Sequence, residues 1–241
     1  MFNFLKNKSA NTSIPETIKP LCPYCSFAFD KMPTRKAKCK SCGKEFSVRT
    51  HYLNKNKIIL TDKEAILYDI EKDKYYTDKS LIDGLKMYID ESNDEIDNLV
   101  EKTRIELTAK FGKPASLGDV GWGVANRLVV EAIKKNNMGF LRSIYFQMGL
   151  YLHNTGKDSS AVMENSFNID LNEYKKSDVV KKVEVIATTE SCDYCKALNG
   201  KIFSISEALE KKILPCKQCI YKLNKNAKTG WCRCCYAPFL E

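Results

Sequence analysis

Residues 22–44 read CPYCSFAFDKMPTRKAKCKSCGK and hold two Cys-x-x-Cys pairs separated by 13 residues, Cys22/Cys25 and Cys39/Cys42. Two residues between cysteines let both sulfurs face one ion within a tight turn. Two such pairs supply four thiolates, which hold zinc in a closed tetrahedron at about 2.3 Å. The stretch therefore predicts a structural zinc site. A reactive dithiol and an iron–sulfur centre are the alternatives for the same four thiols.

A second cysteine-rich stretch lies in the last quarter of the chain and supplies seven further candidate ligands: Cys192, Cys195, Cys216, Cys219, Cys232, Cys234 and Cys235. Three tight cysteine groups within 44 residues favour metal binding over free buried thiols. The first two pairs alone fit a zinc-ribbon spacing. Seven thiols exceed one tetrahedral site, so a two-metal cluster with a bridging thiolate is an alternative. The sequence predicts two zinc ions in the whole chain and does not choose the four C-terminal ligands.

The N-terminal part of the chain carries a net charge equal to that of the whole chain. The formal net charge is +9, and residues 1–57 hold 12 Lys/Arg against 3 Asp/Glu, so the remainder is neutral. Such a patch indicates a polyanionic partner such as nucleic acid, with a solvated tail as the alternative. The candidate nucleic-acid contacts are Lys31, Arg35, Lys36, Lys38, Lys40, Lys44 and Arg49. Interleaved aromatic residues could stack bases, but a small ribbon core explains them better.

The fold class expected from these patterns is mainly α, with small β zinc modules at both ends. We divide the chain into a flexible lead-in at 1–20, a basic zinc ribbon at 21–60, a helical bundle at 61–178 and a cysteine-rich zinc-binding α+β module at 179–241. A protein partner could bind the helical part. A β-rich run at 179–186 leads into the last cysteines and is expected to support them.

Helix boundaries are predicted from capping residues. Thr61 and Glu64 fit a capping box that opens a short helix, and Lys113-Pro114 ends a later helical pattern. Ser116 and Asp119 can begin the next helix. A turn through 136–139 should precede a helix over 141–152, and another helix carries Val162, Phe167 and Leu171. Ser204 and Glu207 fit a further capping box inside the cysteine-rich module.

Several functional classes find no support in the sequence. No stretch approaches the roughly 20 apolar residues that span a bilayer, and the first residues lack the features of a signal peptide. We therefore expect a cytoplasmic protein without membrane contact, whose thiols stay reduced. The chain has only two histidines, His51 and His153, and none of the common catalytic fingerprints. A non-enzymatic protein is expected, with a zinc-dependent or thiol enzyme as the alternative.

The segment CPYCSFAFDKMPTRKAKCKSCGKEFSVRT resembles the zinc-ribbon family over about 30 residues. This resemblance implies two β-hairpins clamped on one zinc. Ribbons serve in nucleic-acid binding and as protein-interaction modules, so both functions stay open.

The segments SCDYCKALNGKIF and GWCRCCYAPF resemble the C-terminal module of phage head-morphogenesis (minor head) proteins. The matching positions are Cys192, Cys195, Leu198, Gly200, Lys201, Cys232 and Cys234. The resemblance implies Cys192, Cys195, Cys232 and Cys234 as shared ligands, with Cys216 or Cys219 substituting or adding. It departs where the family has a histidine, because Pro215 is followed here by Cys216. It suggests a phage or prophage setting and an assembly role.

The segment around 145–171 resembles a single tetratricopeptide hairpin, with Met148-Gly149, Leu152, Gly156 and Ala161 near the small and apolar positions of that motif. Only one such unit is visible, and a helical repeat needs about three to bury a continuous core. A helical hairpin within a small bundle is therefore expected.

Overall fold

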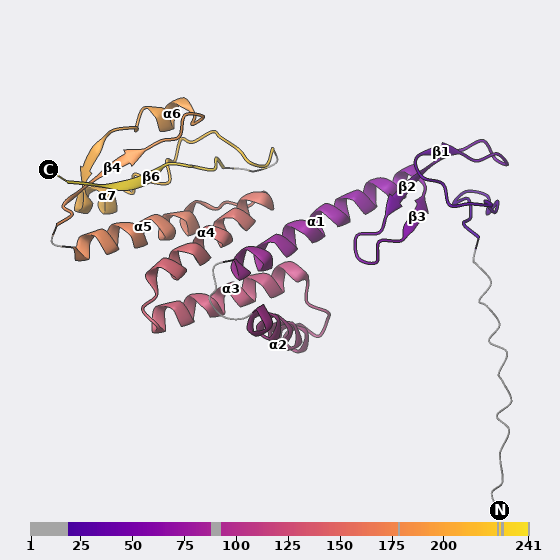
Figure 1. Cartoon of the computed structure of the whole chain (residues 1–241), viewed down its shortest axis with the longest axis horizontal. Helices are drawn as coiled ribbons and strands as arrows, with labels where there is room; N and C mark the ends of the chain where they lie inside the picture. The colour runs from indigo at the N-terminus through magenta and orange to yellow at the C-terminus, as the bar shows by residue number, and fades with distance from the viewer. Residues whose placement is uncertain (1–18, 88–92, 178, 226, 228, 241) are drawn as a thin grey trace, which may run out of the picture. The chain divides into compact units, whose positions relative to one another are not determined.

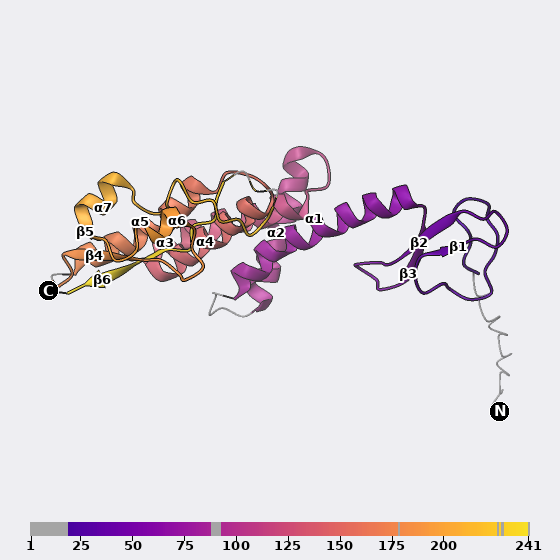
Figure 2. The ribbon, with the colours of Figure 1, turned by 90° about the horizontal axis from the view of Figure 1, so that it is seen from above.

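The structure is a computed structural model that describes residues 19–87, 93–177, 179–225, 227 and 229–240. These residues form seven helices and two small antiparallel sheets of three strands each (Figures 1 and 2). The predicted fold class, mainly α with small β modules, is confirmed at this level. Each helix in these ranges is too short or too polar to cross a lipid bilayer. Most of the predicted lead-in at 1–20 lies outside the described residues.

The described residues divide into two compact units, with the boundary between Lys72 and Asp73. The first unit contains a three-stranded antiparallel sheet in the order β1-β2-β3, formed by β1 (Ala37–Lys38), β2 (Glu45–Thr50) and β3 (Lys57–Leu60). Phe46 on β2 is completely buried and packs with the cysteines of the first stretch. The core of this unit is therefore too small to support it without further cross-linking.

Helix α1 (Asp62–Lys86) begins at the capping box predicted from the sequence. The N–H of Thr61 donates to the Glu64 carboxylate at 2.8 Å, and the N–H of Glu64 donates to Oγ1 of Thr61 at 3.2 Å. The prediction of a short helix is wrong. The polar residues between Ile70 and Leu81 contain neither proline nor glycine, so the helix continues through them.

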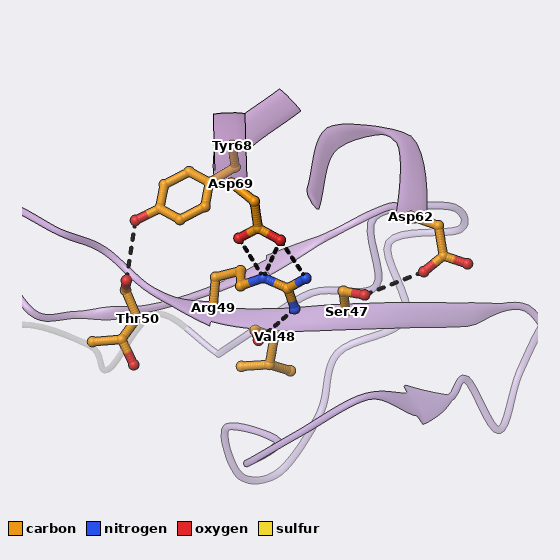
Figure 3. A network of polar contacts seen from close by, with 7 residues as sticks. All are labelled: Ser47, Val48, Arg49, Thr50, Asp62, Tyr68 and Asp69. Atoms are coloured by element: carbon orange, nitrogen blue, oxygen red, sulfur yellow. Dashed lines mark hydrogen bonds and ion pairs between the residues drawn. The ribbon is translucent and has the colours of Figure 1, made fainter. Parts of the chain in front are cut away.

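Polar contacts join strand β2 to the first turns of α1 within the first unit (Figure 3). The Ser47 hydroxyl donates to the Asp62 carboxylate at 3.2 Å. The Tyr68 hydroxyl donates to the carbonyl oxygen of Thr50 at 3.0 Å. These contacts orient the sheet on the helix start and supplement the small apolar core.

Helices of the second unit pack in chain order, each against the next: α2 (Asn93–Phe111), α3 (Leu117–Lys134), α4 (Met138–Asn154) and α5 (Ser160–Lys176). Helix α3 begins at its predicted cap, because Oγ of Ser116 accepts from the N–H of Asp119 at 3.1 Å. The predicted break at Lys113-Pro114 follows the end of α2. Gly139, expected in the turn, lies in the first turn of α4 instead.

A small α+β layer completes the second unit. Its elements are β4 (Lys182–Ile186), α6 (Asp193–Lys196), β5 (Ile202–Ser204), α7 (Ile205–Lys211) and β6 (Cys235–Phe239). The sheet order is β5-β4-β6, and both α7 and β6 pack against α5 (Figures 1 and 2). Val183 and Val185 on the central strand are completely buried. The β-rich run read from the sequence is thus the central strand beside the last cysteines.

Candidate metal centres

The four cysteines of the first stretch converge in the first unit. Their sulfurs all lie within 4.8 Å of one another. Sγ of Cys22 lies 3.9 Å from Sγ of Cys42, and Sγ of Cys25 lies 3.7 Å from Sγ of Cys39. Four sulfurs around one zinc at about 2.3 Å are spaced by about 3.8 Å. The arrangement fits one tetrahedral ion with no position left for a substrate.

Both pairs of this first centre sit in the same kind of turn. The N–H of Ser26 donates to the carbonyl oxygen of Cys22 at 3.0 Å, and the N–H of Gly43 donates to that of Cys39 at 2.9 Å. Ser26 and Gly43 have φ angles of 58° and 71°. This left-handed conformation folds the chain back over the sulfurs, and it suits glycine best.

Electrostatics at the first centre favour a cation. The backbone N–H of Cys42, with that of Ser41, lowers the pKa of Cys39 to about 7 against the effect of burial. The N–H of Lys44 favours the thiolate of Cys42, but burial and the surrounding thiols raise the pKa of Cys42 to about 11. Ionisation of Cys39 is therefore favoured, whereas ionisation of Cys42 is opposed by burial and by the neighbouring thiols. A bound divalent cation would offset that opposition.

Five of the seven C-terminal cysteines converge in the second unit. The sulfurs of Cys192, Cys195 and Cys219 lie within 4.8 Å of one another, as do those of Cys195, Cys232 and Cys234. The Cys192–Cys219 and Cys195–Cys232 pairs are each separated by 3.9 Å. These separations match the first centre. Cys195 belongs to both groups, so the five sulfurs form one cluster.

Burial and backbone donors act in opposite directions on these thiols. Burial opposes ionisation of Cys192, but the N–H groups of Ile220 and Cys195 lower its pKa to about 7. The Cys232 thiol, followed by burial, raises the pKa of Cys219. As in the first centre, one thiolate is favoured and its neighbours need a cation.

The other two C-terminal cysteines play different parts. Cys216 donates its backbone N–H to the sulfur of Cys232, while its side chain joins neither group. Cys235 is exposed on β6 and also lies outside both groups. All eleven cysteines are free thiols. Neither His51 nor His153 joins a metal-binding group among the residues the structure describes.

His153 holds the loop between Cys219 and Cys232 against α4. The imidazole is fully buried, and its Nε2 accepts hydrogen bonds from the N–H groups of Leu223 at 3.2 Å and Asn224 at 3.4 Å. Burial, followed by the charge of Lys222, lowers the pKa of His153. The ring stays neutral, as an acceptor must. Sequence reasoning gave His153 no role, because nothing local indicates a partner 70 residues away.

Gly230 lets the chain pass close to the loop that follows Cys219. A Cβ atom at this position would lie 1.8 Å from the carbonyl oxygen of Cys219. The next residue, Trp231, donates its N–H to the carbonyl oxygen of Tyr221 at 2.6 Å. Its ring is buried, with the centroid 5.4 Å from that of His153. The close approach of two backbone segments thus places Cys232 beside the other sulfurs.

Several of the predicted nucleic-acid contacts are engaged within the first unit. Nε of Arg49 donates to Oδ1 of Asp69 at 2.9 Å, and a terminal guanidinium nitrogen donates to Oδ2 at 2.8 Å (Figure 3). Lys36 forms an ion pair with Glu45 at 3.0 Å, and Lys38 lies 3.9 Å from the same carboxylate. The bidentate geometry gives Arg49 a structural role.

Three of the seven predicted cations remain available. Lys31, Arg35 and Lys40 are exposed and have no ion pair with the described residues. Lys44 is exposed as well, but its ammonium lies 5.1 Å from the ring centre of Tyr24. The available positive charge is therefore carried mainly by the segment between the two cysteine pairs and by the second pair itself.

The aromatic residues of the first unit divide into two groups. Phe29 packs against the buried Phe46 with ring centres 5.2 Å apart. Phe27 and Tyr24 are exposed by 39% and 37%. The ribbon core that the sequence favoured thus accounts for Phe29 and Phe46, whereas Phe27 lies edge-on to Phe29 with ring centres 5.7 Å apart and keeps part of its ring exposed.

A groove of about 470 Å³ lies beside the second centre, between α4, α5 and residues 231–235. Its apolar lining includes Phe146, Met163, Phe167 and Trp231. An ion pair between Arg142 and Asp170, at 3.2 Å, lines the same groove. No sequence pattern indicated it, because its walls come from three separate segments.

Comparison of the chain with protein-family models, curated proteins and solved structures finds no match.

Proposed function

We propose that this chain is a non-enzymatic zinc protein in which one thiolate centre holds the basic N-terminal module and a second holds the C-terminal module. The observation that carries the proposal is the convergence of the four sulfurs of Cys22, Cys25, Cys39 and Cys42. Four thiolates with no open position are the ligand set of structural zinc. Iron in the same tetrahedron is the main competitor.

The N-terminal module has the features of a zinc ribbon, and we propose that it is one. One of its cysteine turns precedes a short antiparallel sheet and the other connects strands β1 and β2. Its apolar core is little more than Phe46 and the cysteines. A module with so small a core needs the ion to fold. The resemblance noted from the sequence supports the same assignment.

We propose further that the ribbon binds nucleic acid through phosphate contacts from Lys31, Arg35 and Lys40. These side chains are exposed and free of ion pairs with the described residues. The exposed ring of Phe27 is available for stacking on a base. Charge neutralisation of this kind makes binding strongly dependent on salt.

Metal analysis of the full chain, purified under reducing conditions, tests the first part of the proposal. We expect about two zinc ions per chain and a tetrathiolate environment, with zinc–sulfur distances of about 2.3 Å. Iron in place of zinc would contradict the choice of metal. A chain without bound metal would contradict the proposal as a whole.

Binding to a duplex of mixed sequence across a salt series tests the nucleic-acid role. We expect replacement of Lys31, Arg35 and Lys40 by glutamine to flatten the slope of log affinity against log salt. Each lost phosphate contact should contribute about 0.9. Glutamine at Lys102, Lys134 and Lys157, exposed in the second unit, is the matched control and should leave the slope unchanged. Equal effects of the two triple variants, or no binding at about 50 mM salt, would rule the role out.

An assembly adaptor is the second candidate function, and the groove between α4, α5 and residues 231–235 favours it. Its apolar lining suits a side chain from a protein partner better than a phosphate. The resemblance to phage head-morphogenesis proteins points the same way. Absence of nucleic-acid binding together with a stable stoichiometric protein complex would favour this candidate. Replacing Phe146 with aspartate should then dissociate the complex.

A further inference from the structure

Five sulfurs crowd the C-terminal centre, one more than a tetrahedral ion takes. The sequence resemblance implies Cys234 as a ligand and leaves Cys219 as a substitute or an addition. We propose the opposite: one ion is held by Cys192, Cys195, Cys219 and Cys232, while Cys234 is a thiol beside the ion that does not bind it. This inference rests on the proposed function, because it presumes that the second centre holds a metal.

The separations between sulfurs repeat the pattern of the first centre. There, the first cysteine of one pair lies 3.9 Å from a sulfur of the other pair, and the second cysteine lies 3.7 Å from the remaining sulfur. In the C-terminal centre, Cys192 lies 3.9 Å from Cys219 and Cys195 lies 3.9 Å from Cys232. Cys192, Cys195 and Cys219 lie within 4.8 Å of one another, and the contact with Cys195 makes Cys232 the fourth ligand of a tetrahedron. Like Cys232, Cys234 shares a group with Cys195 but not with Cys192 or Cys219, so the 3.9 Å contact between Cys195 and Cys232 decides between them.

Backbone donors serve three of these four sulfurs, those of Cys192, Cys219 and Cys232. The N–H of Tyr221, two residues after Cys219, donates to the sulfur of Cys219. The N–H groups of Cys216 and Cys234 donate to the sulfur of Cys232. In the first centre, the N–H of Lys44 donates in the same way to Cys42, two residues before it. Such bonds orient and stabilise a metal-bound thiolate.

Cys234 has the position of a supporting residue. Its sulfur lies within 4.8 Å of those of Cys195 and Cys232, and its thiol hydrogen bonds to Cys195. Its backbone N–H serves Cys232. The residue is buried, with 3% of its surface exposed. A thiol in this place donates to a ligand sulfur and orients it, as outer-shell partners of metal ligands do.

Cadmium-113 substitution of the full chain identifies the ligands without mutation. Scalar coupling between the ¹¹³Cd nucleus and cysteine Hβ protons reports only the residues whose sulfurs bind the metal. At the C-terminal centre we expect couplings to Cys192, Cys195, Cys219 and Cys232. Coupling to Cys234 in place of any of these, or Cys195 coupled to two cadmium ions, would overturn the inference and leave the proposed function standing. Cadmium at the first centre alone would overturn both.

Serine variants give an independent readout through zinc affinity. We expect Cys219→Ser to lose the second zinc or to weaken its binding by more than 100-fold. Cys234→Ser keeps a hydrogen-bond donor, so two zinc ions should remain, with affinity changed by less than tenfold. Cys234→Ala should weaken binding by about 10- to 100-fold, as for other outer-shell partners. Cys216→Ser and Cys235→Ser are matched controls and should keep both ions. Retention of both ions in Cys219→Ser with loss in Cys234→Ser would refute the assignment.

Discussion

The backbone N–H of Leu223 donates to Nε2 of His153 across 70 residues of chain. The acceptor lies on α4, and the donor lies in the loop that separates Cys219 from Cys232. The position of the loop between these two cysteines therefore depends on a helix outside the cysteine-rich segment. A protonated imidazole has no lone pair to offer, so this contact exists only in the neutral form.

The first prediction concerns pH. Burial and Lys222 lower the pKa of folded His153 below its ordinary value of 6.5. As pH falls below about 6.5, the unfolded chain takes up a proton that the folded chain resists, so the free energy of unfolding decreases. Above that pH the residue contributes no pH dependence. Chemical denaturation of the zinc-loaded chain measures the effect. The series should run from about pH 7.5 to about pH 5.5, roughly one unit on each side of 6.5.

Replacing His153 with glutamine isolates this contribution. The amide oxygen can accept from the same N–H groups and does not titrate. The variant should lose stability less steeply on acidification, while the effect of thiol protonation is common to both chains. Parallel curves for the two proteins would show that His153 does not govern the acid response.

The second prediction concerns Gly230. Alanine there would place a Cβ atom 1.8 Å from the carbonyl oxygen of Cys219, so one of the two backbone segments has to move. We expect Gly230→Ala to weaken the second zinc site and to destabilise the folded chain by about 2–4 kcal/mol, in the range of overpacking and backbone strain. Gly139→Ala is the control, because nothing lies within 4 Å of its Cβ position in α4. It should be neutral or stabilising by up to about 1 kcal/mol. Thermal unfolding and zinc content should be measured for both variants. Equal stability and equal zinc content in the two would contradict the prediction.

The third prediction distinguishes a structural role for Arg49 from a nucleic-acid-binding role for Lys40 in the first unit. The Arg49–Asp69 ion pair is partly exposed, with 33% and 44% of the side chains accessible. Arg49→Gln should therefore cost less than about 1 kcal/mol of stability. It should also leave the salt dependence of nucleic-acid binding unchanged, because the guanidinium is already paired. Lys40→Gln should show the reverse, with stability kept and the salt slope reduced. A reduced slope in Arg49→Gln would mean that the arginine exchanges Asp69 for a phosphate.

The fourth prediction concerns metal removal. Trp231 is buried beside Cys232, whereas the apolar cluster of α1 to α4 in the second unit contains no cysteine. The chain has one other tryptophan, Trp122, and its replacement by phenylalanine leaves Trp231 as the source of the tryptophan emission. In this Trp122→Phe background, chelation should shift the emission of Trp231 to longer wavelength as its ring meets water. Most of the helical circular dichroism should persist. Complete loss of the helical signal on chelation would show that the helices depend on the ion.

Local signals made much of the fold predictable. The caps at Thr61, Ser116 and Ser204 are confirmed, because a capping residue and its partner are three positions apart and need no tertiary contact. Local signals also explain why the length of α1 was mispredicted. Its polar central turns carry no apolar period to read, yet nothing in them ends a helix.

The sequence identified the residues of the candidate sites, but it did not predict which of them contact one another. Cysteine spacing brought all candidate ligands into view, but the contact between Cys195 and Cys232 spans 37 positions and depends on the path of the loop. The same limit hid the Arg49–Asp69 pair, since a count of charges cannot tell a paired cation from a free one.

The span of chain that each centre encloses bears on how the protein is made. Cys22 and Cys42 are 20 positions apart, whereas the contacts of the second centre span 27 and 37 positions. Closing the longer loops costs only about 0.5 kcal/mol more in entropy. The two centres differ more in when their ligands are synthesised than in this entropy cost. A ribosome exposes every ligand of the first ion before it has made Cys192. The first module can thus load its metal and fold while the second is still untranslated.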